Sequence, residues 1–107
     1  MKKKTKDKGI EGSIMQSPTD TRCYIHLKYM GLQVNGTEQH HCIHGQGRRA
    51  LADEDGLVVM LCPTCHRALH DKRYHDRDLQ VLAQLAWEVH YSKSAQDFID
   101  RYGKSYL

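Results

Sequence analysis

The stretch CPTCHRALH, residues 62–70, combines two cysteines at metal-ligand spacing with two histidines four residues apart. Two thiols separated by two residues can bind one tetrahedral zinc ion from the same tight turn. If a helix begins at or just after Cys65, His66 and His70 lie one turn apart on the same face and can bind a second metal ion. The stretch therefore predicts two metal sites with different roles, in preference to a reduced surface pair of cysteines followed by two solvated histidines.

A closed zinc site needs two further ligands, and the sequence offers them upstream. Cys23 and His26 have the Cys-x-x-His spacing of a second half-site. Together with Cys62 and Cys65 they complete a Cys3His site that ties the start of the fold to its centre. Cys42 is the competing fourth ligand, but its position among alternating apolar residues favours a small buried side chain.

The length of the chain, 107 residues, is enough for one small domain. Domains below about 80 ordered residues commonly need a metal or disulfides to be stable. The N-terminal sequence MKKKTKDK has no apolar run of the kind found in signal peptides, so we expect a reducing, cytoplasmic environment in which the thiols bind zinc in preference to forming disulfides. No run of about 18 apolar residues occurs, so no membrane span is predicted.

The net charge of +3 is mildly basic and does not by itself indicate a nucleic-acid partner. Five lysines fall within residues 2–8, and Arg48-Arg49 form a second basic patch. We interpret residues 1–20 as a flexible basic arm, because they contain too few apolar residues to offset the entropy lost on ordering. The lysines can contact DNA or simply keep the protein in solution. Residues 21–107 then form the domain.

The coarse secondary structure is that of an α+β protein. Residues 57–61 are apolar and β-branched, which predicts a strand that leads into Cys62. A shorter strand is expected over residues 39–44. The other predicted elements are a tight turn at Asn35-Gly36, a polar loop over residues 50–56, a helix over residues 79–91 capped by Asp78, and a last helix between Ser94 and Gly103.

The order of these elements resembles that of HNH endonucleases with a ββα-metal core: a strand ending in His-His, a loop, a second strand, Cys-x-x-Cys-His and a helix. The motif covers residues 39–70, and the Cys-x-x-His pair at residues 23–26 resembles the extra zinc half-site of many such domains. A narrower resemblance is to small phage-encoded HNH-like nucleases. It rests on HHCIHG at residues 40–45, DGLVVMLC at 55–62 and RYGKSYL at 101–107.

The resemblance implies a role for each histidine of the motif. His41 corresponds to the general base that takes a proton from the attacking water, while His40, His66 and His70 correspond to ligands of one catalytic divalent ion. A neutral imidazole can accept a proton near neutral pH, and a divalent ion can neutralise the scissile phosphate. Nitrogen ligands suit Zn2+ or Ni2+ better than Mg2+ or Mn2+, although the latter two remain candidates in an assay.

The central Asn of the HNH motif is missing, because Asp55-Gly56-Leu57 stands where Asn-Leu is usual. We therefore expect Asp55, or the backbone near Gly56, to hold His41. Neighbouring residues of a regular strand face opposite sides, so His40 and His41 can serve one phosphate only if the strand is irregular there. The roles of the two histidines could also be exchanged.

Three further residues are expected at the nucleic-acid surface of such a nuclease. His44 is a candidate contact to DNA and could also replace one of the two preceding histidines. Arg48 and Arg49 are candidate phosphate clamps.

The function implied by the resemblance is a metal-dependent DNA endonuclease in the cytoplasm of a bacterial host, encoded by a phage or prophage. Recombination, packaging or replication would be its setting, with DNA and proteins of those processes as partners. The alternative is a non-catalytic zinc module that binds nucleic acid or protein, which the missing Asn favours slightly. The four additional histidines favour the enzyme more strongly, because a structural zinc ion needs only the first four ligands.

Overall fold

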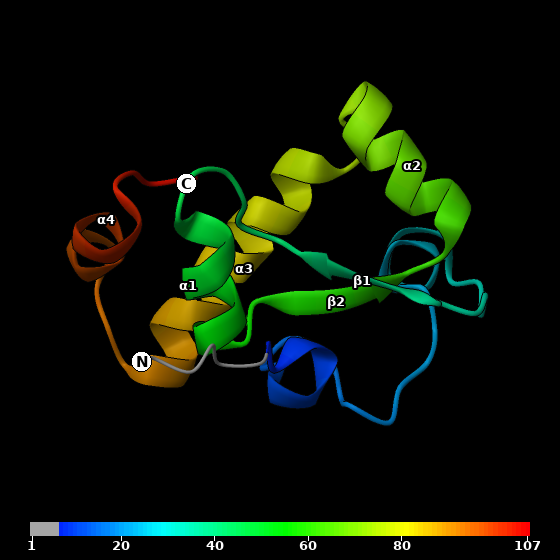
Figure 1. Ribbon diagram of the computed structural model, residues 1–107, viewed down its shortest axis with the longest axis horizontal. Helices are drawn as coiled ribbons and strands as arrows, with labels where there is room; N and C mark the ends of the chain where they lie inside the picture. The colour runs from blue at the N-terminus through cyan, green and yellow to red at the C-terminus, as the bar shows by residue number, and fades with distance from the viewer. Residues whose placement is uncertain (1–6) are drawn as a thin grey trace, which may run out of the picture.

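The computed structural model describes residues 7–107 and has an α+β fold built on a two-stranded sheet (Figure 1). Residues 1–6, which hold four of the five N-terminal lysines, lie outside the described residues. In chain order the elements are the 3-10 helix η1 (Gly9–Gly12), the π-helix η2 (His26–Met30), β1 (Glu38–His41), α1 (Arg48–Asp55), β2 (Val58–Leu61), α2 (Pro63–Lys72), α3 (Asp76–Tyr91) and α4 (Ala95–Tyr102). Within residues 7–107, every helix is too short or too polar to cross a membrane.

The two strands run antiparallel, with His40 opposite Val59 and His41 opposite Val58. Because side chains alternate along a strand, β1 presents Glu38 and His40 to one face and Gln39 and His41 to the other. The first face meets α2, where Glu38 contacts a histidine of that helix. The second face meets η1 and α1. The strand thus sends its two neighbouring histidines to different surroundings.

The junction between β2 and α2 is built by the Cys-x-x-Cys stretch itself. Cys62 is the N-cap of α2, and its sulfur accepts a hydrogen bond from the backbone N–H of Cys65. Pro63 occupies the first helical position, where its missing N–H has no partner to lose. The helix begins slightly earlier than the sequence predicts, and it still places His66 and His70 one turn apart on one face.

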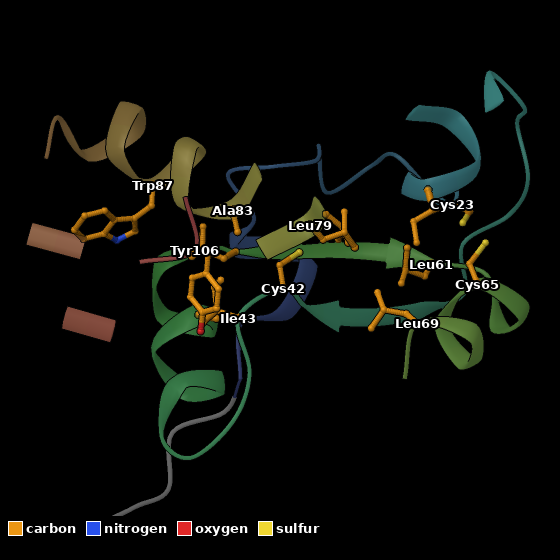
Figure 2. Packing of buried hydrophobic residues seen from close by; sticks show 14 of the residues in the cluster. Cys23, Cys42, Ile43, Leu61, Cys65, Leu69, Leu79, Ala83, Trp87 and Tyr106 are labelled. Atoms are coloured by element: carbon orange, nitrogen blue, oxygen red, sulfur yellow. The ribbon is translucent and has the colours of Figure 1, made fainter. Parts of the chain in front are cut away.

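The long core runs from the Cys-x-x-Cys end of the sheet to the C-terminal helices (Figure 2). Figure 2 shows Cys23 and Cys65 at one end and Trp87 at the other, with Cys42 between them. α3 begins three residues before its predicted start, and α4 begins with the expected capping box of Ser94 and Asp97.

The predicted loop over residues 50–56 is wrong, because residues 48–55 form the helix α1. Arg, Ala, Leu and Glu in this stretch are good helix formers, and the acidic residues of its last turns are held by tertiary hydrogen bonds that offset an unfavourable helix dipole. The helix ends at Gly56, which adopts a left-handed conformation with φ of 81°.

The turn predicted at Asn35-Gly36 does not join two strands of a hairpin. Asn35 instead pairs with Arg22 in an isolated bridge, and the N–H of Gly36 donates to the carbonyl of Thr21. A Cβ at Gly36 would lie 3.0 Å from the backbone oxygen of Arg22, so the glycine here permits close approach of two chain segments.

The segment before Thr21, predicted to be a flexible arm, departs from that expectation wherever the structure describes it. The N–H of Ile14 donates to the carbonyl of Gly56, and the hydroxyl of Ser13 donates to that of Val58. The side-chain oxygen of Gln16 accepts the N–H of Met60. Polar groups thus fasten a segment that has few apolar side chains to bury.

Candidate metal centres and their surroundings

The first cluster consists of the four residues predicted as zinc ligands: Cys23, His26, Cys62 and Cys65. Their ligand atoms all lie within 4.8 Å of one another. His26 Nδ1 is 3.6 Å from the sulfur of Cys62 and 3.5 Å from that of Cys65. Ligands of one tetrahedral zinc ion lie about 3.5–4 Å apart. The cluster is therefore compatible with a structural zinc ion.

The surroundings of this cluster explain why a cation would stabilise it. All four cysteines of the chain are free thiols. Burial raises the pKa of Cys65, and the nearby sulfur atoms of Cys62 and Cys23 raise it further. A divalent cation reverses this effect, because it stabilises the thiolate form that binds it. Cys42 lies in the apolar core and not at the cluster, as its sequence context favours.

The second cluster consists of His40 from β1 and of His66 and His70 from α2, whose ligand atoms also lie within 4.8 Å of one another. The Nε2 atoms of His66 and His70 are 3.2 Å apart. His40 is only 2% exposed, and its Nε2 is the one buried side-chain polar atom without a hydrogen-bond partner in residues 7–107. Such an orphaned nitrogen costs about 1–3 kcal/mol unless another group binds it.

The protonation state of His40 suits a ligand. Burial lowers the pKa of His40 to about 3, and the neighbouring imidazoles of His66, His70, His44 and His41 contribute to this shift. The ring is therefore neutral at physiological pH, which is the form that binds a metal ion.

Glu38 is a residue of this cluster that the sequence analysis missed. Its Oε1 lies 2.7 Å from Nδ1 of His66. A carboxylate only accepts hydrogen bonds, so it holds the proton of His66 on Nδ1 and leaves Nε2 free to face the other imidazoles. Glu38 precedes His40 by two residues and shares its face of β1, so the alternation of the strand could have indicated it.

His41 lies beside a carboxylate, and that carboxylate belongs to Asp53 and not to Asp55. Asp53 Oδ1 is 2.9 Å from Nε2 of His41, and both side chains are buried. Burial acts to raise the pKa of Asp53, but hydrogen bonds from His41 and from two backbone N–H groups outweigh it and lower the pKa. Two residues along a helix turn by about 200°, so Asp53 and Asp55 face opposite sides of α1.

Asp55, predicted to hold His41, fastens α1 to α3 and α4. Its Oδ2 accepts hydrogen bonds from Trp87 Nε1 at 2.8 Å and from the Tyr102 hydroxyl at 2.6 Å. Arg101 donates Nε to Oδ2 at 2.6 Å and a terminal nitrogen to Oδ1 at 2.9 Å. This carboxylate therefore has a role in stability.

We expect Asp55→Ala to lower the free energy of unfolding by about 3 kcal/mol, because it leaves two buried donors and a partly buried guanidinium without their acceptor. Urea unfolding followed by circular dichroism measures the loss. Asp100→Ala is the matched control, since Asp100 is exposed on α4. Equal midpoints for the two variants would contradict the assignment.

A hollow of about 220 Å3 opens above the second cluster. Its lining consists of Gln39, His40, His41, His44, Arg49, His66 and His70. His44 Nε2 is 3.1 Å from a carboxylate oxygen of Asp76.

Of the two arginines predicted as phosphate clamps, only Arg49 lines this hollow. Its guanidinium is 3.1 Å from the carboxylate of Asp7. Arg48 points elsewhere, because its Nε donates to the carbonyl of Tyr102 at 2.8 Å.

The neighbouring residues His40 and His41 have different partners but border the same hollow. His40 joins the three-imidazole cluster, whereas His41 pairs with Asp53, and the rings of both line the same hollow. Strand β1 ends at His41, so two residues that face opposite sides of the sheet can still border one opening at its end.

Comparisons with protein-family models, with curated proteins and with solved structures find no match to this chain.

Proposed function

We propose that the chain is a metal-dependent endonuclease of the HNH type, which hydrolyses phosphodiester bonds in DNA. The observation that carries the proposal is the buried, unpartnered Nε2 of His40 beside the imidazoles of His66 and His70. Three imidazole nitrogens fit one divalent transition-metal ion and leave coordination positions open, as in catalytic sites. If these side chains were purely structural, nothing would offset the cost of burying Nε2 of His40 without a partner.

The chemistry divides between the two faces of β1. An ion bound by His40, His66 and His70 would supply electrostatic stabilisation of the phosphate and of the leaving oxygen. His41, which is paired with Asp53 at the edge of the same hollow, takes the proton of the attacking water. Arg49 lies where it can bind a neighbouring phosphate once it leaves Asp7.

The arrangement of elements supports the choice of reaction class. The ligands come from the end of β1 and from one face of α2, and β2 leads directly into that helix. Apart from α1, which stands between the two strands where a loop was expected, this is the order on which the resemblance to ββα-metal nucleases rests. The phage or prophage setting, the bacterial cytoplasm and a role in recombination, packaging or replication belong to the proposal through the same resemblance.

The test is cleavage of supercoiled plasmid by the purified protein, with Zn2+, Ni2+, Mg2+ and Mn2+ added in turn. We expect nicked and linear DNA with at least one metal, complete inhibition by a chelator, and two bound ions per chain in native mass spectrometry. His70→Ala should lose one of the two ions together with cleavage.

The absence of cleavage would decide between the two candidate functions. A wild-type protein that binds one zinc ion and cuts no DNA with any of these metals would exclude the enzyme. That outcome would favour the non-catalytic zinc module, whose four ligands form the other cluster.

A further inference from the structure

We propose that the N-terminal segment is part of the active site, because the backbone N–H groups of Lys8 and Gly9 hold Asp53 in the position that orients His41. Asp53 is then a positioning residue, and residues 8–12 do more than extend the basic surface. This inference rests on the proposed function, since it assigns the support of the general base.

Every oxygen of the Asp53 carboxylate has an assigned partner. Oδ2 accepts the N–H of Lys8 at 2.7 Å, and Oδ1 accepts the N–H of Gly9 at 2.8 Å. The same Oδ1 lies 2.9 Å from Nε2 of His41. Asp53 is only 5% exposed, so water does not substitute for these donors. Two successive amides thus fix the orientation of the carboxylate that contacts the imidazole of His41.

The contact determines which nitrogen of His41 can act. A carboxylate is an acceptor only, so Nε2 carries the proton in the neutral ring and Nδ1 has the free lone pair. A base supported in this way is held in one tautomer and one orientation, just as the aspartate of a Ser-His-Asp triad holds its histidine. Nδ1 of His41 is therefore the atom that we assign as the proton acceptor.

The position of the two amides depends on the close packing of η1 against β1. Gly9 has φ of 57°, and a Cβ at this residue would lie 2.0 Å from Oε1 of Gln39. That oxygen is itself engaged, because it accepts the N–H of Ile10 at 2.6 Å. Only glycine combines this backbone conformation with this contact. A side chain at position 9 must either shift the amide away from Asp53 or push the Gln39 side chain aside and break its hydrogen bond to Ile10, which helps to hold η1 against β1.

The experiment compares Gly9→Ala with Gly31→Ala. Gly31 is the matched control, because its φ of 67° gives alanine a similar backbone strain while no atom lies within 4 Å of the added Cβ. We expect Gly9→Ala to lower the rate of plasmid cleavage about 100-fold, as displacements of about 1 Å do in other active sites. Gly31→Ala should cleave at nearly the wild-type rate. Both should bind the same ions as the wild type.

A second measurement does not depend on cleavage. The 15N chemical shifts of His41 report its tautomer, and we expect the proton on Nε2 in the wild-type protein. In Asp53→Asn the side-chain amide can face the ring, so both tautomers should be populated and cleavage should fall. A structural defect alone would not exchange the tautomer, and this variant also decides the matter if Gly9→Ala does not fold.

The outcomes separate this inference from the proposed function. A wild-type protein that cuts no DNA but carries the His41 proton on Nε2 supports the positioning and excludes the nuclease. A wild-type protein that cuts DNA, with Gly9→Ala and Asp53→Asn equally active or with the proton on Nδ1 of His41, overturns the positioning and leaves the nuclease intact.

Discussion

Replacing Cys62 by serine is expected to unfold the domain at room temperature. Structural zinc contributes about 10 kcal/mol or more of folding free energy in small domains, while the total stability of a domain is about 5–15 kcal/mol. Serine caps a helix as well as cysteine can, so α2 keeps its N-cap and the change removes mainly the bond from sulfur to metal. Circular dichroism melting and zinc analysis of the purified variant measure the result.

The matched control is Cys42→Ala, which also alters a buried cysteine. Cys42 lies in the apolar core away from the zinc ligands, so its removal leaves a small cavity and costs about 1 kcal/mol. This variant should retain its zinc and melt cooperatively. If Cys62→Ser melted cooperatively at the wild-type temperature, zinc would have no part in holding the fold.

Spacing within a short stretch explains what could be predicted from the sequence. The α+β class is confirmed. The predicted cluster of Cys23, His26, Cys62 and Cys65 is confirmed as a site compatible with zinc. Each half-site depends on local geometry, because a Cys-x-x-Cys turn places two thiols together, and the meeting of the two half-sites follows from the four ligands that a closed zinc site needs. In the same way, a helix places residues four apart on one face. The capping box at Ser94 was predictable for the same reason.

The support of His41 could not be predicted, because it depends on which side of α1 faces the sheet. The sequence DED at residues 53–55 places acidic side chains in three directions, about 100° apart, around a helix. The rotation of α1 is set by Asp55, which binds Trp87 and Tyr102 from helices much later in the chain. That tertiary contact turns Asp53 toward His41, and neither charge nor periodicity reveals it.

The part of the N-terminal segment that the structure describes, residues 7–20, differs from the expected flexible arm for a related reason. Its composition is that of a solvated arm, since it has few apolar residues to bury. Its contacts with the domain instead use backbone amides and small polar side chains, as between Gly9 and Asp53 or Ser13 and Val58. Composition indicates how much apolar surface a segment can bury. It does not indicate whether hydrogen bonds hold that segment against the domain.

Replacing His41 by alanine is expected to reduce DNA cleavage by about 100-fold to 10,000-fold, the usual contribution of a general base. His41 makes its described hydrogen bond to Asp53 and takes no part in the cluster of His40, His66 and His70. The variant should therefore keep both metal ions in native mass spectrometry. His90→Ala is the matched control, because His90 is an exposed histidine on α3, and it should cleave like the wild type.

The metal count of this variant distinguishes a base from a ligand, which a loss of activity alone cannot do. His40→Ala should lose both cleavage and one ion, since it removes the buried nitrogen that faces the other two imidazoles. If His41→Ala lost the ion and His40→Ala kept it, the two roles would be exchanged. If His41→Ala cut DNA at the wild-type rate, the proton acceptor would have to be another group at the hollow, and His44 with its partner Asp76 would be the next to test.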